Sequence, residues 1–213
     1  MARPLNFTES EMNNFFDKVR ILQWDNHRYY HQSRINQTIH LISAMSFLAA
    51  YLLLFVDPAA AGIVGWLIGT VMRQSGHIFF EPRCFDEING VSDSYKESIK
   101  VGYNTRLKAI LIGLGFSLPM VLFVSPTLLG LIEPAQSVAA YWHNVGLAWL
   151  ALGVCGVCYR TLHLFALRGT SWGLAWAIKI ILDPFHNIAI YWRSPFALTQ
   201  GQMLDPITTD SLN

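Results

Sequence analysis

Long apolar blocks separated by short polar segments dominate the chain, and they predict membrane-spanning helices. A helix of about 20 apolar residues crosses the hydrocarbon core of a bilayer. Four blocks approach that length, at residues 38–56, 59–80, 107–132 and 141–167. The first two are joined by a short turn that contains Asp57 and Pro58, so they should form a hairpin, whereas Pro119 and Pro126 should kink or shorten the third. The pattern predicts an all-α integral membrane protein that forms one domain over residues 1–213.

Two further segments have the pattern of helices that lie at a membrane surface. Near the N-terminus, a capping box of Thr8 and Glu11 precedes apolar residues at helical spacing, which are Met12, Phe15, Phe16, Val19 and Leu22. Towards the C-terminus, residues 172–192 are apolar but contain Lys179 and Pro184. We expect this second segment to be an interfacial or re-entrant helix that breaks before Pro184.

The basic residues predict the orientation of the spans. Thirteen of the 15 lysines and arginines are predicted on the same side of the membrane. They precede the first span, stand between the second and third spans or at their ends, or follow the fourth span. The two turns on the opposite side carry none, Lys108 stands at the very start of the third span, and only Arg73 and Arg160 lie deeper within spans. By the positive-inside rule, both termini should be cytosolic, in a bacterial inner membrane or a membrane like that of the endoplasmic reticulum.

Composition narrows the functional classes further. The chain is 53% hydrophobic and carries a net charge of +1, so nothing in it suggests nucleic-acid binding. None of the three cysteines, Cys84, Cys155 and Cys158, falls in a segment expected outside the cytosol, so no disulfide framework is predicted. The N-terminus lacks a basic start followed by an apolar run, so we expect no cleaved signal peptide.

Histidines provide the main indication of chemistry. Six of the seven are predicted to lie at one depth, at the cytosolic ends of the spans, and these are His27, His31, His40, His77, His163 and His186. Imidazole is the commonest ligand for redox metals, and polar groups at membrane depth are costly unless they are used. We therefore predict a histidine-rich metal site, with His143 at the opposite face. A packing or headgroup contact is the alternative for any single histidine, and which of the six bind the metal directly stays open.

Polar residues near this layer are candidates for supporting roles. Asn36 and Glu81 each lie four residues from a histidine, so they could orient metal ligands. Arg73 lies one helical turn before His77, and we expect it to pair with Glu81 or with a substrate carboxylate. Arg160 is predicted at a similar depth, and snorkelling to lipid headgroups is the alternative for both arginines.

Two motifs carry a resemblance to a known family. The first consists of Tyr30-His31, Asn36 and His40 before the first span, and the second is Gly76-His77-x-x-Phe80-Glu81, preceded by Gln74. In this order they resemble the yeast-type 2-hydroxy fatty acid dioxygenases, small integral-membrane enzymes that depend on iron(II) and act in fatty acid α-oxidation. The resemblance covers roughly residues 29–83, and the chain departs from it at Gln32, where the family often has a second histidine.

The resemblance implies that His31, His40 and His77 hold iron or lie close to it. It also implies a long-chain 2-hydroxy acid substrate that is shortened by one carbon to an aldehyde. We therefore expect an oxygenase with one or two Fe²⁺ ions that uses O2 and a lipid-like or fatty-acid-like substrate among membrane lipids, with no nucleic acid. Formation of a homo-oligomer stays open.

Two other functional classes remain as alternative hypotheses. A di-iron membrane hydroxylase or desaturase would be expected to carry denser H-x-x-H-H boxes than this sequence has. A non-catalytic metal-binding or transport protein would be expected to place polar residues along a path through the membrane. The middles of the first and third spans are almost wholly apolar, which favours a site that opens at one face.

Overall fold

All regular structure in the described part of the chain is helical. The computed structural model describes residues 15–81, 85–87, 89–103 and 105–205. Its helices are α1 (Phe15–Tyr30), α2 (Arg34–Leu53), α3 (Pro58–Ile63), the π-helix η1 (Val64–Thr70), α4 (Val71–Phe79), α5 (Asp93–Ile99), α6 (Thr105–Val124), α7 (Val138–Arg168), α8 (Thr170–Tyr191) and α9 (Ser194–Thr199). Two isolated β-bridges are the only strand-like pairings among these residues. The predicted all-α class is confirmed.

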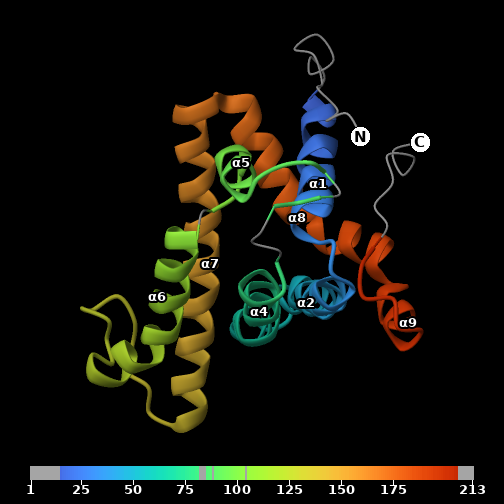
Figure 1. Cartoon of the computed structure of the whole chain (residues 1–213). Helices are drawn as coiled ribbons and strands as arrows, with labels where there is room; N and C mark the ends of the chain where they lie inside the picture. Colours follow the sequence, from blue (N-terminus) through green and yellow to red (C-terminus); the bar gives the residue numbers. More distant parts are fainter. Residues whose placement is uncertain (1–14, 82–84, 88, 104, 206–213) are drawn as a thin grey trace.

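The longer helices form two pairs, α6 with α7 and α2 with α4, and α8 packs against members of both. In Figure 1, α6 and α7 run side by side in the plane of the picture, whereas α2 and α4 are neighbours seen end-on, so the two pairs cross. Gly169 has φ +88°, a backbone conformation that favours glycine, and it makes the sharp turn between α7 and α8. From this turn, α8 runs past α1 and packs against both α7 and α2.

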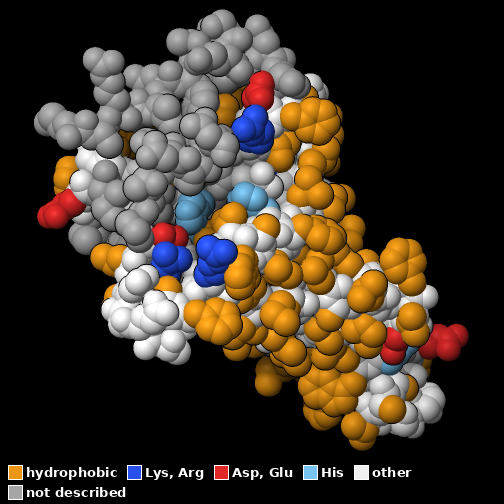
Figure 2. Space-filling model, turned by 90° about the vertical axis from the view of Figure 1, so that its right-hand side faces the viewer, with side chains coloured by type: hydrophobic (Ala, Val, Ile, Leu, Met, Phe, Trp, Pro, Cys, Tyr) orange, Lys and Arg blue, Asp and Glu red, His pale blue; other side chains and the backbone are white. Residues whose placement is uncertain are grey.

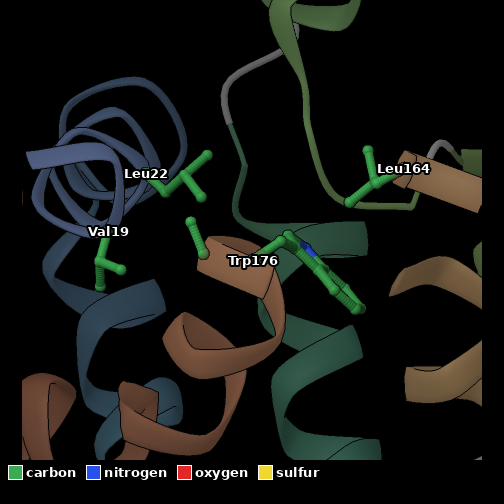
Figure 3. Close-up of a cluster of buried hydrophobic side chains, with 5 residues drawn as sticks. Val19, Leu22, Leu164 and Trp176 are labelled. Atoms are coloured by element: carbon green, nitrogen blue, oxygen red, sulfur yellow. The ribbon is translucent and has the colours of Figure 1, made fainter. Parts of the chain in front are cut away.

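Two apolar clusters hold this arrangement together. One consists of Val19, Leu22, Leu164, Ala175 and Trp176, and Figure 3 shows Trp176 of α8 between Val19 and Leu22 of α1 and Leu164 of α7. The second consists of Trp66, Leu122, Val145 and Trp149 and lies where the α2–α4 hairpin meets α6 and α7. A Cβ atom on either Gly62 or Gly146 would collide with the backbone of the other segment, so small residues permit the close contact of α3 with α7.

Within the described residues, two helices, rather than the four predicted, are long and apolar enough to cross a membrane. These are α6, from Arg106, and α7. Only 11% of the residues in the most apolar stretch of each are buried inside the protein, so they are not core helices. The first predicted span corresponds to α2, whose opening turns contain buried polar residues, and the second is divided into α3, η1 and α4. The prediction of four spans is therefore supported for α6 and α7 alone.

The outer surface shows how the apolar residues are distributed. Figure 2 shows one face on which hydrophobic side chains cover a broad area, with most charged and histidine side chains gathered on one side of it. A smaller polar group lies at the far end of that area. Several of the most exposed side chains are large and apolar, among them Leu129 at 93%, Phe55 at 89% and Phe123 at 77% exposure. Such an extended apolar surface is typical of a protein that contacts lipid or another protein.

The ends of the other predicted elements need correction. The third predicted span ends at Val124 rather than at residue 132, because the chain turns from Ser125 onwards, and Pro119 lies inside α6. The predicted break before Pro184 is wrong, because α8 continues through it to Tyr191. Contacts of Asp183 with Lys179 and with Arg73 stabilise α8 at this point.

The N-terminal segment is helical within the described residues, as the sequence predicted. α1 spans Phe15–Tyr30, and Val19 and Leu22 are buried as predicted, whereas Phe16, which was expected on the same apolar face, is 68% exposed. The capping box of Thr8 and Glu11, together with Met12, lies outside the described residues.

Candidate metal centre

Three of the predicted histidines meet in one group. His31 lies in the short link between α1 and α2, His40 on α2 and His77 on α4. Their ring centroids are 4.1 Å apart for His31 and His40, 4.8 Å for His40 and His77, and 5.2 Å for His31 and His77. One nitrogen from each ring lies within 4.8 Å of the others, so the group could hold a metal ion.

The hydrogen bonding of these rings also fits a metal. His31 and His40 are completely buried. His31 Nε2 and both ring nitrogens of His40 have no hydrogen-bond partner among the described residues. A buried polar atom without a partner costs about 1–3 kcal/mol, so several such atoms that face one another need an explanation. Burial also lowers the pKa of His31 well below its usual value, which keeps the imidazole neutral and able to bind a cation.

Local structure brings the two helices of the hairpin close enough for this group to form. A Cβ atom on Gly76 would collide with Asn36 Oδ1 and would press on the ring of His40, so glycine allows α4 to lie directly against α2. Asn36 Nδ2 donates a hydrogen bond of 2.8 Å to the backbone oxygen of Tyr30, which fixes the link that carries His31. Asn36 therefore holds the backbone next to His31, and its orienting role toward a metal ligand stays a prediction.

Glu81 fixes the third ring. His77 Nδ1 lies 2.6 Å from Glu81 Oε2, and Glu81 Oε1 accepts a hydrogen bond of 3.0 Å from Lys100 Nζ. A carboxylate at Nδ1 favours the tautomer with its proton there, which leaves the lone pair of Nε2 free for a metal. Glu81 thus contacts a member of the group and does not pair with Arg73.

Tyr191 links the group to His27. Its hydroxyl lies 3.0 Å from His31 Nδ1 and 3.2 Å from His27 Nδ1. Burial raises the pKa of Tyr191 well above its usual value, so the hydroxyl stays protonated. Burial also lowers the pKa of His27 to about 4, so its neutral ring can accept a hydrogen bond. The tyrosine hydroxyl therefore bridges the two rings, and Asn26 Nδ2 also lies 3.2 Å from His31 Nδ1, so His27 lies behind His31 rather than in the group.

The remaining predicted histidines lie outside this group. His163 is on α7, where its Nδ1 lies 3.1 Å from Arg160 Nη1. His186 is on α8, and its electrostatic neighbours are Asp183 and Lys179. The structure thus brings together three of the six predicted ligands.

Both predicted arginines have structural partners. Arg73 Nη2 forms an ion pair of 2.6 Å with Asp183 Oδ2, and Lys179 Nζ lies 2.7 Å from the same oxygen. The partner of Arg73 is therefore Asp183 rather than Glu81. Arg160 donates hydrogen bonds to the backbone oxygens of Val101 and Gly102, which ties the segment before α6 to α7.

A cavity of about 150 Å³ adjoins the group at His77. It lies between α1, α4, α6, α8 and residues 99–103, and its walls include four basic side chains, which are Arg73, Lys100, Lys108 and Lys179. Lys179 and Asp183 were detectable as a charged pair four residues apart in an apolar segment, whereas no local pattern distinguishes Tyr191 or Lys108.

No protein-family model, curated protein or solved structure matches the chain.

Proposed function

We propose that the protein is a membrane-embedded, iron-dependent oxygenase that acts with O2 on a lipid-like substrate. The observation that carries this proposal is the group of His31, His40 and His77, in which one nitrogen of each ring lies within 4.8 Å of the others, while His31 Nε2 and both ring nitrogens of His40 have no hydrogen-bond partner among the described residues. Iron(II) bound by neutral imidazoles would supply the reducing centre for O2 activation and would keep positions open for substrate. The best candidate substrate is a 2-hydroxy fatty acid that is shortened by one carbon to an aldehyde.

The protein's own residues account for the binding and orientation that this reaction needs. Glu81 and Tyr191 hold the rings of His77 and His31 from behind, so the group is rigid before substrate arrives. The adjoining cavity admits a polar group beside His77. The apolar outer faces of α6 and α7 would contact lipid, with both termini in the cytosol, so that an acyl chain can reach the cavity from within the membrane.

The metal content of the protein gives the first test. Protein purified anaerobically in detergent should contain about one equivalent of iron, because the described residues include one group of three or more histidine, cysteine or acidic ligands. His40→Ala and His77→Ala should each lose the metal, whereas His163→Ala, outside the group, should retain it. Less than half an equivalent of any transition metal in the wild type would overturn the proposal.

The reaction gives the second test. Iron-loaded protein should consume O2 when it is given a 2-hydroxy fatty acid, and a one-carbon-shorter aldehyde should appear. Full metal content without O2 consumption would favour the other class of function, a non-catalytic metal-binding protein. The complete burial of His31 and His40 is the observation that suits this second candidate, because structural metal sites are closed.

A further inference from the structure

We propose that Lys108 binds the carboxylate of the substrate, in the cavity beside His77, and that the acyl chain leaves this cavity along α6. This inference rests on the proposed function and deepens it by naming the residue that recognises the charged end of the ligand. It follows from the charge balance of the cavity, from the position of Lys108 and from a second cavity that continues the first.

The basic side chains of the cavity are not fully neutralised by the protein. Arg73 and Lys179 share the single carboxylate of Asp183. Lys100 forms ion pairs with Glu81, at 3.0 Å, and with Glu97, at 2.7 Å, so its charge is already compensated. The one acidic residue in the cavity wall, Asp25, is paired with Arg28 at 2.8 Å.

Lys108 differs from the other three basic residues. Its ammonium group has no hydrogen-bond or ion-pair partner within the part of the chain that the structure describes. It lies in the first turn of α6, where the helix dipole disfavours a cation, and the positively charged Lys100 and Arg73 line the same cavity. A partly buried cation in this position is costly, and an anion in the cavity would relieve that cost.

A second polar group in the wall also lacks a partner. Gln74 lines the cavity one turn before His77, and its buried side-chain oxygen has no hydrogen-bond partner among the described residues. An amide oxygen accepts hydrogen bonds, so it would suit a hydroxyl group on the ligand. The cavity thus offers one uncompensated cation and one free acceptor beside a ring of the histidine group.

The acyl chain has an apolar continuation. A volume of about 150 Å³ holds a headgroup but not a long chain. A second cavity of about 110 Å³ shares Thr70, Gln74 and Ile112 with the first and extends to Trp66 and Phe116. Ile112 and Phe116 lie one turn apart on α6, so a chain that starts at Lys108 would follow this helix into its apolar part.

Ligand binding tests the assignment without turnover. Protein loaded with Zn²⁺, which does not support O2 chemistry, is titrated calorimetrically with 2-hydroxydodecanoate, its methyl ester and dodecyl phosphate. Lys108→Met should weaken binding of the carboxylate by about 10- to 100-fold, the value of a hydrogen bond to a charged group. Binding of the ester should change little, and Lys108→Arg should retain most of the affinity for the acid. Arg106→Met is the matched control, because Arg106 is exposed on the same helix and does not line the cavity.

The binding results distinguish a failure of the role proposed for Lys108 from a failure of the proposed function. Equal weakening for acid and ester would assign Lys108 a purely structural role and overturn the inference, as would wild-type affinity in Lys108→Met. Tighter binding of dodecyl phosphate than of the acid would also overturn it, since the anion would then be a phosphate headgroup. Metal content is measured on each sample. A wild type without bound metal contradicts the proposed function, whereas a metal-loaded protein that fails only the lysine test contradicts this inference alone.

Discussion

The three histidines of the group differ in the contacts that their ring nitrogens make. Glu81 lies behind His77 and Tyr191 behind His31, whereas neither nitrogen of His40 has a partner among the described residues. The residue spacing indicated Asn36 and Glu81 as supporting residues, because both lie on the same helix or helix end as a histidine. Tyr191 could not be found in this way, since it lies 160 residues from His31 in the chain.

Removing the charge of Glu81 should weaken the metal site. In Glu81→Gln, the amide is a poorer acceptor for His77 Nδ1–H, so we expect metal affinity to fall by about 10- to 100-fold, as for other residues behind metal ligands. Competition with a chelator measures this. Glu97→Gln is the control, because Glu97 also pairs with Lys100 but no contact with His77 is found for it. Equal losses in both variants would mean that the effect acts through Lys100.

Removing the hydroxyl of Tyr191 should have a related effect on His31. In Tyr191→Phe, the ring volume stays and only the hydrogen bonds to His31 and His27 are lost. We expect a similar 10- to 100-fold loss of metal affinity, with little change in thermal stability measured by circular dichroism. Tyr159→Phe, an exposed position on α7, should behave like the wild type. An unchanged chelator titration for Tyr191→Phe would show that this contact does not orient the ligand.

At the scale of the elements, the contact between α2 and α4 builds the site. Helical periodicity indicated that His40 and His77 would lie at similar depth on neighbouring helices, and the structure agrees. The periodicity did not indicate that the second segment contains a π-helix, η1, or that Pro184 lies inside an unbroken α8. Both depend on contacts with other helices: η1 packs against α2 and α7, and Asp183 binds Arg73 of α4.

A methyl group between α2 and α4 should damage the site. In Gly76→Ala, the added Cβ would collide with Asn36 Oδ1 and lie about 3 Å from the ring of His40, so the helices must separate. We expect a lower metal content and lower thermal stability. Gly153→Ala on α7 is the matched control, because a Cβ there meets no atom within 4 Å, and the change should be neutral or slightly stabilising. A fully metal-loaded Gly76→Ala protein would show that the contact is more adaptable than its geometry indicates.

For the whole molecule, the apolar outer surface of α6 and α7 predicts integration into a membrane. The protein should stay in the membrane fraction after extraction with alkaline carbonate. An arginine in the middle of a span costs about 2.5–3.5 kcal/mol for insertion, and less near its end. Val154→Arg, at an exposed position in the middle of α7, should therefore reduce the membrane-inserted amount strongly, whereas Val138→Arg, at the exposed start of α7, should have a small effect. Similar amounts for the two variants would contradict a membrane-spanning α7.

The sequence by itself determined the helical class, the apolar character of α6 and α7, and a set of six candidate histidines. These follow from local periodicity and from short spacings, which the backbone converts directly into positions on a helix face, whereas only the motif resemblance singled out His31, His40 and His77 among the six. The tertiary structure alone decided that the hairpin of α2 and α4 crosses the other pair. It also decided that His163 and His186 stay outside the group and that Tyr191 and Lys108 adjoin it. The physical reason is that these placements depend on packing between segments distant in the chain, at glycine contacts and buried ion pairs that no local pattern specifies.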